Sequence, residues 1–250
     1  QIFSASMAGL LAVAIGWRNT FLLAGVVATA AAIAATIYLR ETPGVVRRSI
    51  SVASAIAGYR LVFANPKAYV CFATVCAEGI ALWGVTPYVA DLLIKSGTGT
   101  TREAGFVIGG IGVGGLLFTL MLPVLVRVLG RTAMMGIGGI LGTAGLVALI
   151  LDLDWVTIAL AFCATGFGYM MLHNAIQNES VELAPSARSS AYSMHAFFFF
   201  VGQSLGPVLF GLWLGQAGAE TALYLCAAIF AVTGVIAGAA FAVLERDGRR

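Results

Sequence analysis

The chain has 250 residues, of which 60% are apolar and 10% are charged, and its formal net charge is +3. Soluble domains carry about 25% charged residues, so this composition excludes a soluble globular domain built around one large core. A lipid bilayer is the solvent in which so apolar a chain is stable. The four cysteines lie inside apolar runs without CxxC spacing, which favours small buried side chains over disulfides or metal ligands.

The sequence opens at Gln1, inside an apolar run. No basic segment or small-residue cleavage site precedes that run, so the pattern does not indicate a signal peptide. We therefore expect the chain to begin partway through a membrane helix.

Seven apolar runs are long enough to cross the hydrocarbon core, which takes about 20 residues of α-helix. Residues 1–15 are predicted to be the end of an eighth span. Continuous runs of this length are typical of helices and not of the alternating strands of a barrel. The seven full spans are predicted at residues 20–39, 68–94, 104–126, 132–151, 155–177, 190–214 and 221–243.

The Lys and Arg residues of the polar gaps fall mainly on one side of the membrane. The first side holds three, Arg18, Lys95 and Arg102. Positive residues collect in cytoplasmic loops, so the second side is predicted to be cytoplasmic, the C-terminus with it, in an inner (plasma) membrane. The second side holds eleven: Arg40, Arg47, Arg48, Arg60, Lys67, Arg127, Arg131, Arg188, Arg246, Arg249 and Arg250.

The only long gap, residues 40–67, is basic and has a proline near each end. Scattered apolar residues in its middle, residues 49–63, predict a short amphipathic helix on the membrane surface. We expect this gap to be a cytoplasmic linker. It would join the end of one helical bundle, residues 1–39, to a second bundle of six helices with a short tail, residues 68–250.

The two ends of the chain resemble each other. Ala8–Leu11 and the span that ends at Leu39–Glu41 parallel Phe210–Trp213 and the span that ends at Leu244–Arg246, at an offset of about 200 residues. This pattern predicts two homologous six-helix halves. We then expect roughly 130 further residues upstream, enough for four helices.

Several short motifs resemble those of major facilitator transporters. Gly16–Phe21 resembles the outer turn between helices five and six, and Leu39–Pro43 resembles the exit of helix six into the central linker. Arg127–Arg131 resembles the second copy of the loop motif D-R-x-G-R, with Arg in place of the leading Asp. Glu182–Pro185, followed by Gly206–Pro207, resembles the loop and entry of helix eleven.

This resemblance covers essentially the whole chain and implies an all-α membrane protein of the major facilitator fold. The chain would supply the last one and a half helices of the N-terminal bundle and the C-terminal six-helix bundle. The resemblance further implies alternating access around a site between the bundles, and the motifs are most similar to bacterial permeases of the drug or sugar efflux type. No cofactor and no nucleic acid are implied. The partners are a small molecule, protons and lipid, and the full-length protein is expected to act as a monomer.

Glu78 is the strongest candidate for a functional side chain. It lies about ten residues into the span 68–94, near the midplane of the bilayer at 1.5 Å per residue. Ionisable groups at that depth are costly and usually functional, and such a carboxyl can take up and release a proton. Cys71 and Thr74 share its helical stripe. The alternative is a protonated structural side chain that bonds to a neighbouring helix.

A second stripe, Tyr169, His173 and Gln177, follows the 3–4 spacing of one face of the helix 155–177. An ordinary imidazole titrates near pH ~6.5. The resemblance places helices seven and ten around the central cavity, so Glu78 and His173 are predicted to share it. The alternative is that His173 bonds to a backbone carbonyl.

Three further residues complete the predicted pathway. His195 begins the next span, and Gln203 lies at mid-depth, where it can bind substrate through a hydrogen bond. Pro87 removes a backbone hydrogen bond and is predicted to kink the seventh helix for gating. The aromatic run Phe197–Phe200 suits either a planar substrate or contact with lipid, and Asp91 either function or the outer interface.

Glycines at small-x-x-x-small spacing predict close helix packing. The pairs are Gly105 with Gly109, Gly110 with Gly114, Gly138 with Gly142, and Gly202 with Gly206.

These patterns together predict proton-coupled efflux of a small organic molecule by alternating access. The alternatives within the class are an uptake symporter and a uniporter for a sugar or metabolite. A membrane-embedded enzyme and a seven-helix receptor are more distant. The sequence has neither a Walker motif nor an HExxH pair, and its short loops disfavour a receptor.

Overall fold

The computed structural model describes residues 2–38, 51–151 and 153–247, and every regular element within these ranges is a helix. The Leu39–Pro43 motif, the first part of the predicted linker and the last three residues of the tail lie outside the described residues. In chain order the elements are α1 (Ile2–Ile15), α2 (Trp17–Tyr38), α3 (Val52–Phe63), α4 (Lys67–Glu78), η1 (Gly79–Trp83), η2 (Thr86–Tyr88), α5 (Val89–Ser96), α6 (Thr101–Val128), α7 (Gly130–Leu141), α8 (Ala144–Ile150), α9 (Trp155–Glu182), η3 (Pro185–Ala187) and α10 (Arg188–Asp247).

The described residues contain six helical stretches that are long and apolar enough to cross a membrane. The last, Pro185–Leu244, has 60 residues and is two spans, because Gly218 inside it has a non-helical backbone with φ 85° and ψ 169°. The elements α4 to α5 form one span over Lys67–Ser96, and α7 with α8 forms another over Gly130–Ile150. The predicted all-α membrane fold is therefore confirmed.

Three connections between spans are shorter than the sequence pattern predicted. The expected outer loop at residues 16–19 is a single residue, Gly16 with φ 80°, and the expected loop at residues 215–220 is the break at Gly218. Gly130, with φ 73°, likewise turns the chain between α6 and α7. Glycine takes this left-handed conformation without a steric penalty, so one residue reverses a helix where polar composition indicated several.

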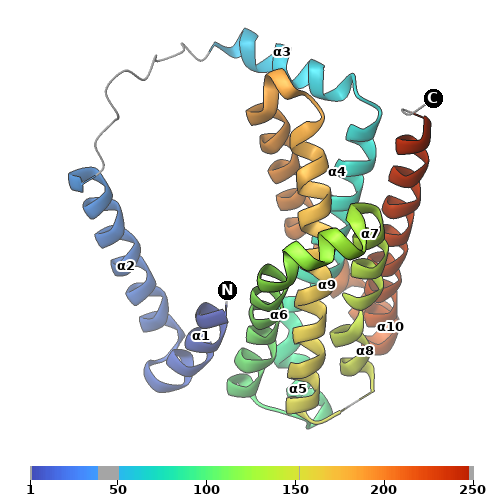
Figure 1. The fold of residues 1–250 in the computed structure, drawn as a ribbon. Helices are drawn as coiled ribbons and strands as arrows, with labels where there is room; N and C mark the ends of the chain where they lie inside the picture. The colour runs from blue at the N-terminus through green and yellow to red at the C-terminus, as the bar shows by residue number, and fades with distance from the viewer. Residues whose placement is uncertain (1, 39–50, 152, 248–250) are drawn as a thin grey trace.

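The elements from α4 to α10 form one helical bundle, beside which α1 and α2 stand (Figure 1). The contact between the two parts is made by α1 and α6, where a Cβ on Gly9 would lie 3.3 Å from the Cα of Gly105. None of the α2 residues is buried, and α2 packs on α1. Its entire length is therefore open to lipid or to further helices.

Helix α3 lies across one end of the bundle, which we call the α3 end (Figure 1). Asn65, just after α3, donates a hydrogen bond from Nδ2 to the carbonyl of Leu183 at 3.1 Å, and its Oδ1 accepts one from the Lys67 N–H at 3.1 Å. A Cβ on Gly58 would lie 2.4 Å from the Ser190 hydroxyl oxygen. The helix is thus held closely against the start of α10.

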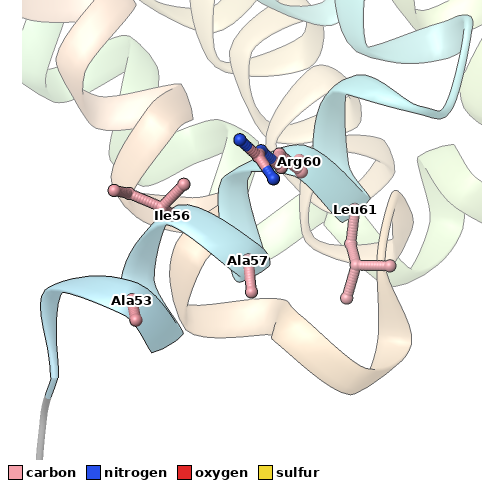
Figure 2. A pocket seen from close by; sticks show the side chains of 5 residues that line it. All are labelled: Ala53, Ile56, Ala57, Arg60 and Leu61. Carbon is pink, nitrogen blue, oxygen red and sulfur yellow. The ribbon is translucent and has the colours of Figure 1, made fainter.

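The outer side of α3 carries a shallow groove of about 570 Å³. Figure 2 shows the two long aliphatic side chains, Ile56 and Leu61, projecting apart with Ala57 between them. Arg60 also lines the groove. An exposed apolar face with a cation beside it agrees with the amphipathic helix that the sequence predicted.

The small-x-x-x-small ridges make the closest helix contacts of the bundle. A Cβ on Gly114 in α6 would lie 1.9 Å from the Cys163 carbonyl oxygen in α9, and one on Gly138 in α7 would lie 2.6 Å from the Gly168 carbonyl oxygen in α9. A Cβ on Gly202 in α10 would lie 2.1 Å from the Cys76 carbonyl oxygen in α4. The prediction that these glycines serve helix packing is confirmed at these contacts.

The loop motif near Arg131 makes a charged contact within the bundle. Arg131 pairs with Glu179 of α9 at 3.2 Å, with the Glu179 side chain 12% exposed. Arg127, which stands where the motif has Asp, is exposed. The contact therefore comes from the second arginine of the motif.

Candidate functional site

The helix that carries Glu78 changes geometry directly after it. The α-helix ends at Glu78, and the next five residues, Gly79–Trp83, form a π-turn. A Cβ on Gly79 would lie 2.8 Å from the Phe199 carbonyl oxygen of α10, so glycine is what lets the two backbones meet here. The carboxylate thus stands at the junction between two helical geometries.

Pro87 lies in the next irregular turn of the same span. It is in the 3-10 turn η2 and is exposed. The neighbouring Tyr88 donates a hydrogen bond from its hydroxyl to the Pro207 carbonyl of α10 at 3.0 Å. The span is therefore irregular at Pro87, as the sequence indicated, and also at the π-turn, which it did not indicate.

Glu78 and His173 contact each other across the α4–α9 interface. The Glu78 carboxyl oxygen Oε1 and His173 Nδ1 form a hydrogen bond. The Glu78 side chain is 0% exposed and the His173 side chain is 15% exposed. Among the residues whose burial the structure describes, Glu78 is the one buried acidic side chain.

Burial makes this contact chemically important. Moving a carboxylate out of water costs about several kcal/mol even in a relaxed protein. A partner that shares a proton with it offsets much of that cost. When both the carboxyl group and the imidazole are fully protonated, the pair has a net positive charge. When it has lost one proton, the pair is neutral. Each change in proton number is therefore a change of charge in an apolar interior.

Aromatic and imidazole rings form a continuous row through the pair. Trp83 and Tyr169 meet edge to face at 6.0 Å between ring centroids, and Tyr169 lies 5.1 Å from His173. His173 is 5.2 Å from His195 and 5.2 Å from Phe199. The row joins residues of η1, α9 and α10, so three helices meet around it.

His195 occupies one end of this row. It is 1% exposed, and its Nδ1 lies 3.1 Å from the Ser180 hydroxyl oxygen. Ser180 also donates a hydrogen bond to the carbonyl of Ile176 at 2.8 Å. The imidazole is thus fixed to α9 on one side through a hydroxyl.

Three buried polar atoms of the row have no hydrogen-bond partner within the part of the chain that the structure describes. They are Glu78 Oε2, Trp83 Nε1 and His195 Nε2. Unpaired buried polar atoms cost about 1–3 kcal/mol each, so each of them calls for a physical explanation. Here a carboxyl oxygen, an indole N–H group and an imidazole nitrogen along one row of side chains lack hydrogen-bond partners among the described residues.

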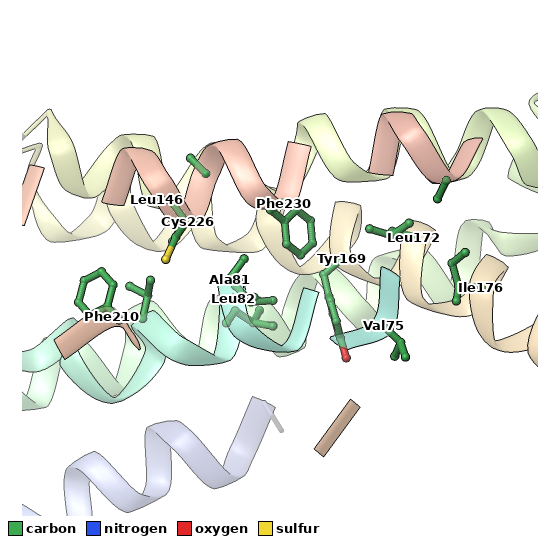
Figure 3. Close-up of a cluster of buried hydrophobic side chains, with 14 of the residues drawn as sticks. Val75, Ala81, Leu82, Leu146, Tyr169, Leu172, Ile176, Phe210, Cys226 and Phe230 are labelled. Atoms are coloured by element: carbon green, nitrogen blue, oxygen red, sulfur yellow. The ribbon is translucent and has the colours of Figure 1, made fainter. Parts of the chain in front are cut away.

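The packing around the row is apolar. Figure 3 shows Tyr169 extending from α9 toward the helix that carries Val75 and Leu82. Tyr169 is 3% exposed, and Val75 and Leu172 are fully buried. The site is therefore set inside the six-helix bundle, with His173 as its most exposed titratable member.

The other sequence-predicted residues are placed less tightly. Thr74 is buried one turn before Glu78 on α4, while Gln177 and Gln203 are partly exposed on α9 and α10. None of the three side chains makes a hydrogen bond to another described residue. The structure thus gathers Glu78 with His173, Tyr169 and His195 and leaves these three beside the row.

Ser180 is the functional candidate that the sequence pattern did not single out. Its position is seven residues after His173, two helical turns along the same face of α9. That spacing is the signal that would have found it. A lone serine near the end of a span is otherwise indistinguishable from an interface residue.

Long apolar helices, close glycine crossings and a buried acid–imidazole pair together define a multi-pass helical membrane protein. The sequence profile of the Major Facilitator Superfamily matches residues 1–178 and, in a second overlapping match, residues 89–250. The chain belongs to the Major Facilitator Superfamily, and it is a secondary transporter of small molecules. Among curated proteins, none matches the chain.

Proposed function

We propose that this transporter couples the export of a small organic molecule to the entry of protons, and that Glu78 and His173 together bind the coupling proton. The observation that carries this proposal is the contact between a fully buried carboxylate and a titratable imidazole on two different helices. In the family fold, these helices belong to the set that lines the central cavity.

The physical argument starts from the charge of the pair. Binding one proton adds a positive charge to an apolar interior, and losing one leaves an unpaired anion, so both events are costly unless the surroundings change. A proton shifts the equilibrium between the two states of a transporter only by the difference between its affinities for those states. A site that water reaches in only one of the states at a time provides this inequality.

The rest of the row suits an organic substrate. Tyr169 and Trp83 offer ring faces beside the pair, and rings of this kind stack on planar or hydrophobic molecules. Thr74, Gln177 and Gln203 supply neutral hydrogen-bonding groups around it, and Pro87 is the gating position. Export is preferred to import because the sequence motifs are most similar to efflux permeases.

The orientation in the membrane is also part of the proposal. Arg60, Lys67 and Arg188 lie at the α3 end, and this end would face the cytoplasm of a cell whose inner (plasma) membrane holds the protein. Residues 1–39 would then end the first bundle, residues 40–67 would link the bundles, and residues 68–250 would form the second. The full-length protein would work as a monomer.

The test uses the full-length natural protein in liposomes that contain the pH indicator pyranine. A panel of labelled sugars, amino acids and hydrophobic cations is added outside, and uptake and internal pH are recorded together. Substrate entry that makes the interior alkaline indicates exchange with protons. An acid change indicates symport, and no change indicates a uniporter.

The Glu78→Gln variant is expected to lose the coupled pH change while it remains folded. Its matched control is Glu220→Gln, the same chemical change at an exposed acid beside the Gly218 break. Substrate uptake without any pH change in the natural protein would contradict the proposal. So would unchanged pH-driven flux in Glu78→Gln.

A further inference from the structure

The tautomer of His195 follows from the hydrogen bonds of Ser180. A serine hydroxyl has one proton to donate, and Ser180 donates it to the Ile176 carbonyl at 2.8 Å. At the 3.1 Å contact with His195 Nδ1, the Ser180 oxygen is then the acceptor. In a neutral imidazole one nitrogen carries the hydrogen and the other a lone pair. With Ser180 donating to Ile176, the matching tautomer has the hydrogen on Nδ1 and a bare acceptor at Nε2.

That bare nitrogen is buried beside the proton-binding pair. His195 Nε2 has no hydrogen-bond partner among the described residues, and the whole residue is 1% exposed. The His195 ring lies 5.2 Å from the His173 ring, centroid to centroid, at an interplanar angle of 63°. An unpaired base in an apolar interior is costly, and the His173 imidazole packs against the same ring.

The titratable neighbours of His195 come from three helices. From α4 come Glu78, through its contact with His173, and Cys71, which lies beside Ser180. From α9 comes His173 itself, and from its own helix comes Tyr192, stacked at 6.5 Å. Of these groups, His173 is the one whose imidazole ring contacts both Glu78 and the His195 ring.

We propose that His195 is a second proton acceptor, which exchanges a proton with the Glu78–His173 pair on the side of the pair that faces the α3 end. This inference rests on the proposed function of the pair. In the forward step the bond from hydrogen to His173 Nε2 breaks and a bond from the same proton to His195 Nε2 forms. His173 becomes neutral and stays in contact with Glu78, while His195 becomes the imidazolium. The reverse step restores the starting state, and no other bond changes.

The position of His195 along α10 gives the step a direction. It lies seven residues after the start of α10 at Arg188, about 10 Å along the helix axis. Ser180 lies two residues before the end of α9, at the same end of the bundle. His195 therefore stands between the buried pair and the α3 end, which is the cytoplasmic end in the proposed orientation.

The experiment follows protons directly and needs no substrate. The full-length natural protein in liposomes is given a rapid pH jump, and the infrared band of the Glu78 carboxyl group, identified by its loss in Glu78→Gln, reports proton arrival. His195→Asn places an amide nitrogen where Nδ1 stood, which keeps a donor to Ser180 and removes the Nε2 acceptor. His195→Gln is the second variant, and Tyr192→Phe, which keeps the stacked ring, is the control.

We expect proton arrival to slow about 100-fold in both His195 variants, the size of effect that one positioned proton-transfer group provides, and to stay within about twofold in the control. Nitrogen NMR of the natural protein should show His195 with hydrogen on Nδ1. Ser180→Ala should increase the share of the other tautomer.

Each outcome decides a different claim. Unchanged arrival rates in the folded His195 variants, or hydrogen on Nε2 in the natural protein, would overturn the role of His195 and leave the proposed function standing. A Glu78 band that does not respond to pH would overturn both. A responding band in a protein whose substrate flux is uncoupled from pH would overturn the proposed function alone.

Discussion

The backbones of Gly84 and Gly206 touch where the span of Glu78 crosses α10. A Cβ on Gly84 would lie 2.8 Å from the carbonyl carbon and oxygen of Gly206, and one on Gly206 would lie 2.8 Å from the Cα of Gly84. No other residue fits at either position without displacing backbone. This crossing fixes how far apart the helices of Glu78 and His195 can lie.

Replacing Gly206 by alanine is expected to destabilise the protein by about 1–3 kcal/mol, the usual cost of forcing extra atoms into a packed interior. The measurement is thermal unfolding in detergent, followed by tryptophan fluorescence. Gly215→Ala is the matched control, because nothing lies within 4 Å of a Cβ there, and alanine favours the helix. Equal stability of the two variants would show that the crossing is looser than described.

Removing the imidazole from the buried pair is expected to cost more than removing the charge of the acid. His173→Ala leaves the Glu78 carboxyl group buried without its partner, which costs about 3–5 kcal/mol for a buried ion pair. Glu78→Gln keeps a group that can bond to the imidazole. A double-mutant cycle measured by chemical unfolding gives the coupling between the two residues. Additive effects would mean that the contact contributes little.

The hydrogen bonds of Asn65 are expected to hold α3 against the bundle. Asn65→Ala removes the bond to the Leu183 carbonyl and the one from the Lys67 N–H, each worth about 0.5–1.5 kcal/mol. Amide hydrogen exchange in residues 52–63 should then become faster. Asn178→Ala, which loses a local bond within α9, is the control and should leave α3 unchanged. Equal exchange rates in both variants would contradict this role.

Asp154 caps the N-terminus of α9 outside the membrane span, and its carboxyl group makes the stability of the protein depend on pH. Its carboxylate accepts hydrogen bonds from the Thr157 hydroxyl at 2.5 Å and from the Val156 and Thr157 N–H groups at 3.0 Å and 3.1 Å. The Thr157 hydroxyl is the first cause that lowers the pKa of Asp154, followed by the backbone N–H groups. A lowered pKa in the folded state contributes stability above the ordinary value of about 3.9, and this stability is lost as the pH falls through the lowered one.

The natural protein is therefore expected to lose melting temperature below about pH 4 in part through Asp154. Asp154→Asn keeps an oxygen for the N–H groups but cannot titrate, so this component of the acid response should disappear while the helix stays capped. Melting curves recorded from about pH 2 to about pH 7 test this point. An identical acid response in the natural protein and the variant would exclude Asp154 as its source.

The sequence was sufficient to predict the helices but not the way they turn. Apolar runs located the spans, because in hydrocarbon only a helix satisfies its own backbone. Loop lengths were overestimated because polar composition does not distinguish a loop from a helix end. The turns at Gly16 and Gly218 depend on backbone conformation. In the sequence, these two glycines cannot be distinguished from the many glycines that serve helix packing.

The candidate site was predictable in its parts and not in its contacts. Depth in the membrane singled out Glu78, and helical spacing singled out His173 on another span. That the two side chains meet depends on how α4 packs against α9, and these two helices are far apart in the chain. Ser180 was missed because its importance comes from the ring of His195 on a third helix.

The π-turn after Glu78 adds one residue to a turn of the helix in its span. Each residue of an α-helix turns the chain by about 100° and advances it by about 1.5 Å. If the π-turn became regular α-helix, or moved along the span, the half that carries Trp83 would rotate and shift relative to the half that carries Glu78. The Glu78 carboxyl group thus lies at the boundary about which the two halves of the span would rotate.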